Sequence, residues 1–224
     1  FIGSTGCGKS TLVNLIPRFY DVTDGKITID GKDIRNVSQH ELREKLGYVP
    51  QKAVLFSGDI ASNILYGNPD GSEAEMTEAA TIAQATEFIE QKKKKYKSTI
   101  SQGGSNVSGG QKQRLSIARA IAKHPDVYIF DDSFSALDYK TDATLRAELK
   151  EKTAESTVMI VAQRISTILH ADQIIVLDDG QIVGKGTHKE LLKNCEAYYQ
   201  IASSQLSENE LEEDLKEVEL YAKR

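Results

Sequence analysis

Short apolar runs alternate with amphipathic segments over the second half of the chain. The runs DVYIFDD (126–132) and TVMIVAQ (157–163) are rich in β-branched and aromatic residues, which is typical of buried strands. Apolar residues have helical spacing over 108–122, before the first run, and over 141–152, between the two runs. Because strands that alternate with helices form parallel sheets, the pattern predicts an α/β fold with a mainly parallel sheet flanked by helices.

The first half of the chain contains shorter signals. A helix is predicted over 9–18, and a short strand over 46–51 that must stop at Pro50. The stretches KITIDGKDI (26–34) and QIIVLDDGQIV (173–183) have the pattern of hairpins. The fold is therefore expected to have an antiparallel β part beside the parallel sheet.

A single domain over residues 1–224 accounts for the whole pattern. Its α/β core comprises 1–70 and 125–206, and an alanine-rich helical stretch predicts an inserted helical subdomain over 71–124. The segment 207–224 has the spacing of an amphipathic helix that docks on its own domain, with a partner contact as the alternative. The apolar face of that helix comprises Leu211, Leu215, Val218 and Ala222.

The charge balance is mildly acidic, with 28 Lys and Arg against 33 Asp and Glu and a formal net charge of −5. Such a chain has no broad basic face, so nucleic acid is not a predicted partner. The run KKKK (92–95) is interpreted as a solvated turn, with a nucleic-acid or lipid contact as the alternative. Only Cys7 and Cys195 occur, which fits a reducing compartment. No apolar run approaches the ~20 residues of a membrane-spanning helix.

The stretch GSTGCGKS (3–10) matches the phosphate-loop pattern G-x-x-x-x-G-K-[ST] in full. Glycines let backbone N–H groups turn toward phosphates, Lys9 neutralises the β and γ charges, and Ser10 coordinates Mg²⁺. The alternative is a glycine-rich turn that only begins a helix, and the full match makes it the weaker one. The predicted nucleotide-binding residues here are Gly3, Ser4, Thr5, Gly6, Cys7, Gly8, Lys9, Ser10 and Thr11.

Only Phe1 and Ile2 precede this loop, although a loop of this kind normally leaves the end of a buried strand. Two residues are too few for a strand. We therefore expect the natural chain to continue upstream and the fold to be incomplete at this end. Cys7 is interpreted as a spacer, although a helix start lowers thiol pKa values and could make it modifiable.

Two neighbouring aspartates end the predicted strand 126–132. An apolar strand that ends in an aspartate, in the same sheet as a phosphate loop, is the usual second half of a nucleotide site. Asp131 is therefore predicted to reach Mg²⁺ through water, and Asp132 to face the γ-phosphate and the attacking water. The alternatives are a helix-capping carboxylate for Asp131 and a merely polar neighbour for Asp132.

The stretch VSGGQ (107–111) provides a second helix start. Ser108 and Gln111 form a capping box, while Gly109 and Gly110 expose the backbone. Such helix ends bind anions, so the chain has two predicted anion-binding sites, one here and one at the phosphate loop. Either one chain holds two phosphates, or two copies of the chain share them.

These stretches resemble the ATP-binding domain of ABC transporters, and specifically of the exporter type, in which transmembrane helices precede this domain in the same chain. The resemblance covers nearly the whole chain and includes GSTGCGKS, YVPQ, NVSGGQKQR, VYIFDD, SALD and VAQR in the family's order and spacing. It implies a P-loop NTPase fold, ATP and Mg²⁺ as cofactors, and a place at the cytoplasmic face of the cell membrane.

The resemblance also assigns roles to residues. Gln51 would touch Mg²⁺ and the transmembrane interface, and Asp138 would communicate across a dimer of ATP-binding domains. The signature residues of VSGGQ would complete the ATP site of the opposing domain, so that two ATP molecules lie between two such domains. The implied partners are a transmembrane domain of the same, longer chain and a second ATP-binding domain.

Two positions depart from the family's pattern. A glutamate usually follows the Mg²⁺ aspartate as the base that orients water, whereas this chain has Asp132. A histidine usually contacts the γ-phosphate within VAQR, whereas this chain has Gln163. Together these changes resemble one half of a heterodimeric exporter, whose partner chain keeps the glutamate and histidine and whose own site binds ATP but hydrolyses it slowly. Asp132 and Gln163 are thus the predicted catalytic residues, and a regulatory half that only clamps ATP is the alternative.

Two other ATPase classes fit the sequence less well. A chromosome-maintenance ATPase head would have a long coiled coil between the loop and the signature, and the interval from Gly3 to Ser108 is too short for one. A soluble tandem-domain translation ATPase would need a second domain and a basic linker, and the sequence shows no pattern typical of either.

In the ABC family an aromatic residue upstream of the phosphate loop stacks on adenine, and that segment is missing from this sequence. We therefore expect weak nucleotide affinity, with Tyr20 as the alternative stacking residue.

Overall fold

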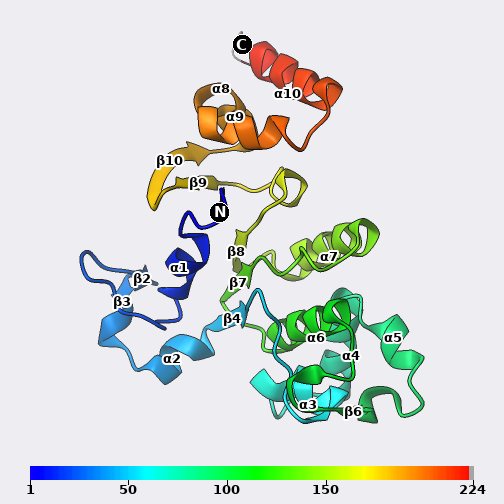
Figure 1. Ribbon diagram of the computed structural model, residues 1–224. Coiled ribbons are helices and arrows are strands. Elements are labelled where there is room, and N and C mark those ends of the chain that lie inside the picture. Colours follow the sequence, from blue (N-terminus) through cyan, green and yellow to red (C-terminus); the bar gives the residue numbers. More distant parts are fainter. Residues whose placement is uncertain (222–224) are drawn as a thin grey trace. The chain divides into compact units, whose positions relative to one another are not determined.

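The computed structural model describes the backbone of residues 1–221 and the side chains of residues 1–214. The chain forms two compact units (Figure 1). The first unit combines residues 1–15 with the segment from Ile160 onwards, and the second comprises residues 16–159. The proposed limits of a helical subdomain at 71–124 stay a prediction.

The first unit contains β1 (Ile2–Gly3), α1 (Lys9–Asn14), the 3-10 turn η5 (Ile165–Thr167), β9 (Ile174–Asp178), β10 (Gln181–Gly186), α8 (His188–Asn194), α9 (Glu196–Ser203) and α10 (Glu208–Tyr221). The second contains β2 (Thr28–Ile29), β3 (Lys32–Asp33), η1 (Ile34–Asn36), α2 (Gln39–Glu44), β4 (Leu46–Val49), β5 (Gly58–Asp59), α3 (Ile60–Ile64), η2 (Leu65–Gly67), α4 (Glu73–Ile82), α5 (Thr86–Glu90), η3 (Lys95–Lys97), β6 (Thr99–Ile100), η4 (Gln102–Gly104), α6 (Gly109–Ala122), β7 (Val127–Asp131) and α7 (Tyr139–Lys152). β8 (Thr157–Val161) crosses the limit between them.

Strand pairing at the centre of the second unit is parallel. β4 lies in register beside β7, from Leu46 opposite Val127 to Val49 opposite Phe130. The strand order is β4-β7-β8, and every residue of β7 is buried, as in a sheet covered on both faces. The helix α6 packs against β4. The predicted α/β fold with parallel strands is confirmed.

The helix α6 is also the centre of the helical part of this unit, because α3 and α4 pack against it (Figure 1). Its buried face includes Leu115, Ile117 and Ile121. The helical stretch predicted from residue 72 to about 91 is in fact two helices, α4 and α5. Gln84 between them has a φ of 56°, a left-handed conformation through which no α-helix continues.

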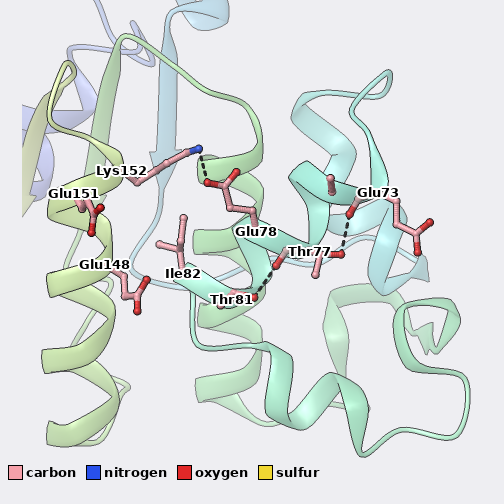
Figure 2. Close-up of a pocket in the computed structure, with 9 residues that line it drawn as sticks. Glu73, Thr77, Glu78, Thr81, Ile82, Glu148, Glu151 and Lys152 are labelled. Atoms are coloured by element: carbon pink, nitrogen blue, oxygen red, sulfur yellow. Dashed lines mark hydrogen bonds and ion pairs between the residues drawn. The ribbon is translucent and has the colours of Figure 1, made fainter.

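The helices α4 and α7 face each other across an open cleft of about 760 Å³ (Figure 2). Lys152 Nζ on α7 donates to Glu78 Oε1 on α4 at 2.7 Å. Glu73, Glu148 and Glu151 also line the cleft. An ion pair as exposed as this one contributes only ~0–1 kcal/mol, so the packing of α4 against α6 has more weight in positioning the helix.

Both predicted hairpins are confirmed. β2 pairs antiparallel with β3 through Asp30 and Gly31, whose φ angles are 51° and 76°. β9 pairs antiparallel with β10 through Asp179 and Gly180, with φ angles of 43° and 73°. Positive φ at both central residues matches the right-handed twist of the paired strands, and Asp-Gly adopts it at low cost.

One helix is shorter than predicted, and one helix had no predicted counterpart. The helix expected over 9–18 ends at Asn14, in keeping with the bias that Pro17 imposes against helical geometry at the residue before it. The helix over 196–203 was not predicted.

Among residues 1–221, no helix has both the length and the mean hydropathy that a membrane crossing requires.

Helices α8, α9 and α10 of the first unit meet around a buried histidine. His188 Nδ1 lies 2.7 Å from Tyr198 Oη, and His188 Nε2 lies 3.0 Å from Asp214 Oδ2. Burial, and then the charge of Asp214, raises the pKa of Tyr198 well above its usual value, so the hydroxyl remains a donor. Leu211 is buried as predicted. The side chains of Leu215 and Val218, and the whole of Ala222, lie outside the described residues.

We expect Tyr198→Phe to lower the free energy of unfolding by about 1–3 kcal/mol, because it leaves a ring nitrogen of buried His188 without its hydroxyl partner. Urea unfolding of the two proteins measures the difference. The matched control is Tyr199→Phe at the next position, whose side chain is 37% exposed. Equal losses in the two variants would contradict the role given to the buried hydroxyl.

Candidate nucleotide site

The phosphate loop of the first unit runs from the end of β1 to the start of α1. β1 lies parallel to β9, with Gly3 opposite Leu177. A Cβ atom added at Gly3 would lie 2.0 Å from the carbonyl oxygen of Leu177 and 2.7 Å from Cys7 Sγ. Gly8 precedes α1 with a φ of 97°, which favours glycine. The loop is therefore packed so closely on the sheet that its first position requires glycine.

Lys9 lies over its own loop. Its Nζ donates to the carbonyl oxygens of Gly3 at 2.8 Å and Ser4 at 2.7 Å. Ser4, Thr5 and Gly6 are exposed, and nothing lies within 4 Å of the Cβ position of Gly6. The ammonium group is thus held at the open side of the loop, where a phosphate would approach.

Cys7 is buried, and its carbonyl oxygen accepts a hydrogen bond from the backbone N–H of Gly180 at 3.2 Å. Its Sγ lies beneath the Cβ position of Gly3. The thiol also lies 3.5 Å from Lys9 Nζ, and the interpretation of Cys7 as a spacer stays a prediction.

The aspartate pair lies at the end of β7 in the second unit. Asp131 is the last residue of the strand and Asp132 follows it, and their exposed fractions are only 4% and 6%. Asp132 has a φ of 49°, a left-handed conformation that aspartate tolerates better than most residues. The turn directs the chain out of the strand and into the SALD stretch.

The segment after β4 contacts this acid pair. Gln51 Nε2 donates to Asp132 Oδ2 at 3.0 Å, and Tyr48 Oη lies 3.5 Å from Asp131 Oδ2. The hydroxyl of Ser133 donates to the carbonyl oxygen of Val49 at 2.9 Å. The structure thus brings the predicted residues Gln51, Asp131 and Asp132 together. It adds Tyr48, for which the sequence contained no signal.

The signature stretch forms the N-terminus of α6, as predicted. The backbone N–H of Gln111 donates to Ser108 Oγ at 3.3 Å, and that of Ser108 donates to Gln111 Oε1 at 3.2 Å. A Cβ atom at Gly109 would meet nothing within 4 Å. One at Gly110 would lie 3.4 Å from the carbonyl oxygen of Ala136. The helix start is therefore ordered by its own capping box and open to the outside at its first residue.

Asp138, at the end of SALD, is the N-cap of α7. It accepts hydrogen bonds from Thr141 N at 3.0 Å and from Thr141 Oγ1 at 2.7 Å. These bonds lower the pKa of the carboxyl group. Asp138 is thus a charged, exposed residue at a helix start, six positions after Asp132.

Gln163 lies just after β8 in the first unit, and its side chain is exposed. Gln205 holds the loop by donating from Nε2 to the carbonyl oxygen of Gln163 at 2.9 Å and by accepting at Oε1 from Ile165 N at 2.8 Å. The loop is therefore held by the segment between α9 and α10, a contact that no local pattern of residues predicts.

The residue types fit a magnesium nucleotide. Mg²⁺ prefers oxygen ligands and is usually bound through one or two carboxylates together with substrate phosphates. In the second unit, the buried carboxylate of Asp131 and the amide of Gln51 carry such oxygens. In the first unit, Ser10 carries a hydroxyl oxygen, and the loop has N–H groups and the ammonium of Lys9, which suit phosphates. Ser10 and the loop belong to the first unit, and Gln51 and Asp131 to the second.

A glycine-rich loop between strand and helix, and an acid pair ending a buried parallel strand, define a P-loop NTPase domain. The chain belongs to the ABC transporter family, since that family's pattern matches residues 1–135. An uncharacterized ABC transporter ATP-binding protein of Mycobacterium bovis is 49% identical over 207 residues, which are 91% of this chain and 35% of that protein. A putative multidrug export ATP-binding/permease protein of Staphylococcus aureus is 45% identical over 92% of this chain and 36% of its own length.

A solved structure is also similar. A bacterial Atm1-family ABC exporter with ATP bound superposes with a TM-score of 0.89 and 40% sequence identity, over 92% of this chain and 36% of that chain. The chain thus spans about a third of the length of the proteins that it matches.

We expect Gly3→Ala to lower the free energy of unfolding by about 3 kcal/mol or more, because the added methyl group collides with the backbone of Leu177. Gly109→Ala is the control, since its methyl group meets open space, and it should change the free energy by less than ~0.5 kcal/mol. Urea unfolding compares both with the parent protein. If the two variants unfold at the same midpoint, the close packing at Gly3 has been misjudged.

Proposed function

We propose that this chain is the ATP-binding and ATP-hydrolysing domain of an ABC exporter, which drives transport by closing on a second ATP-binding domain when ATP binds. The relatives named as export proteins and the exporter structure support this assignment. In this proposal the domain lies at the cytoplasmic face of the cell membrane and is joined to a transmembrane domain in a longer chain.

The observation that supports hydrolytic chemistry most directly is the buried acid pair with its neighbour Gln51. Asp131 would hold Mg²⁺, which neutralises phosphate charge when bound. Asp132 would orient the attacking water and accept its proton, and Gln51, already 3.0 Å from that carboxylate, would help to place the water. Lys9 and the loop N–H groups would bind the β- and γ-phosphates.

The open helix start at Ser108 to Gln111 would complete the ATP site of the second domain. A side chain at Gly109 would meet nothing within 4 Å, so the first residue of α6 is open to an approaching ligand. The positive end of a helix favours an anion. Asp138, at the start of the next helix in sequence, would report the state of one site to the other.

We further propose that the site on this chain hydrolyses ATP slowly. Asp132 is one methylene shorter than the glutamate usual in the family, and Gln163 stays neutral at every pH, unlike the usual histidine. A positioned general base contributes roughly 10²- to 10⁴-fold in rate, or about 3–5 kcal/mol of barrier, and a displaced base would lose much of this. Phosphate binding would depend on residues 3–11, of which 3–10 match the phosphate-loop pattern in full, and on Mg²⁺.

The second candidate is a regulatory half that clamps ATP through many cycles without hydrolysing it. The same contact favours it: in this structure Gln51 occupies Oδ2 of Asp132, the carboxylate that would have to act on water. The two candidates differ only in turnover at this chain's own site.

We expect Asp132→Glu combined with Gln163→His to add a second fast site per heterodimer in the full-length transporter. Single-turnover hydrolysis of radiolabelled ATP measures this, because the amplitude of the fast phase counts competent sites. Asp132→Asn in the parent chain is the control, because it removes the carboxylate and keeps the size of the side chain.

If the double change leaves the amplitude unaltered while Asp132→Asn abolishes turnover at this site, Asp132 is already a competent base and the slow-site proposal is wrong. If Asp132→Asn changes nothing and the double change adds a fast phase, the clamp describes the parent chain better than slow hydrolysis does.

A further inference from the structure

Tyr48 lies where its hydroxyl group reaches the aspartate that ends β7. In the parallel register Tyr48 is opposite Ile129. Because side chains alternate along a strand, Ile129 and Asp131 project from the same face of the sheet as Tyr48. The long phenol side chain spans the remaining distance, so its oxygen lies 3.5 Å from Asp131 Oδ2.

The ring of Tyr48 is fixed by its packing. It meets Phe19 edge to face, with ring centroids 5.3 Å apart and an interplanar angle of 85°. The guanidinium group of Arg43 covers Phe19 at 5.4 Å from its centroid and donates from Nε to the carbonyl oxygen of Pro17 at 3.1 Å. A ring held in this way loses little further freedom when its hydroxyl donates a hydrogen bond.

The hydroxyl group of Tyr48 is a donor at physiological pH. A phenol is neutral at physiological pH and carries one O–H donor. At 3.5 Å from Asp131 Oδ2 the hydroxyl group can donate to the carboxylate, over a distance longer than that of the strongest charge-assisted hydrogen bonds. The neighbouring contact from Gln51 to Asp132 means that one segment, residues 48–51, restrains both carboxylates.

We propose that Tyr48 is a positioning residue for Asp131, whose hydroxyl group holds the carboxylate in the orientation that binds Mg²⁺. The inference rests on the proposed function, because the metal would bind with ATP. Partners that hydrogen-bond a metal ligand orient it and raise metal affinity, so the loss of this hydroxyl should weaken Mg²⁺ binding while the phosphate loop is unaffected.

The test is Tyr48→Phe in the full-length transporter with its partner chain. This change removes the hydroxyl group and keeps the ring against Phe19. Photolabelling with radioactive azido-ATP, followed by electrophoresis, reports nucleotide binding to this chain alone. We expect the Mg²⁺ concentration for half-maximal labelling to rise about tenfold, while labelling in EDTA stays at the parent level. Tyr199→Phe, a tyrosine on α9 in the other unit, should match the parent in both conditions.

A magnesium requirement equal to that of the parent would overturn the inference. An equal loss of labelling with and without Mg²⁺, together with a lower unfolding temperature, would also overturn it, because the hydroxyl group would then be purely structural. If the parent chain itself is not labelled at any Mg²⁺ concentration, the proposed function fails instead, and the two failures are thereby distinguished.

Discussion

The parallel pairing of β4 with β7 is the constraint on which the chemistry of the second unit depends. Parallel strands end at the same edge of a sheet, so the segment after Val49 and the acid pair after Phe130 come out side by side. A slip of one residue would turn Tyr48 to the opposite face from Asp131. Register, rather than the identity of any one side chain, therefore determines that Gln51 meets Asp132.

The first unit shows the same logic on a smaller scale. β1 has only two residues, yet its pairing with β9 places Gly3 so close to Leu177 that a methyl group would not fit. That close approach turns the loop outward, and Lys9 bonds back to two of its carbonyl oxygens. The geometry of the loop thus depends on backbone contact, which explains why glycine is needed there.

The residues that match the family's pattern and the two that depart from it have different proposed roles. The loop, the buried Asp131 and the capped start of α6 retain the features expected of a nucleotide site and of a signature helix. The departures fall on Asp132 and Gln163, which would act on water and the γ-phosphate. This division is what a slow ATP site that still lends its signature to a partner would require, and it motivates the proposed pairing with a different chain.

Much of the molecule could be predicted because its signals are local. The Asp30-Gly31 and Asp179-Gly180 turns, the capping box from Ser108 to Gln111 and the all-apolar interior of β7 each depend on residues within a few positions of one another. The break between α4 and α5 could not be predicted, because glutamine carries no local signal for the left-handed conformation that position 84 adopts.

By itself the sequence determined the fold class, the family and the residue types of a nucleotide site, since motifs and periodicity are properties of short stretches. Only the tertiary structure decided that Tyr48 faces Asp131 across 83 positions of the chain and that Gln51 binds Asp132 across 81. Contacts at such separations follow from strand register and from the packing of whole elements, and no short stretch of sequence contains that information.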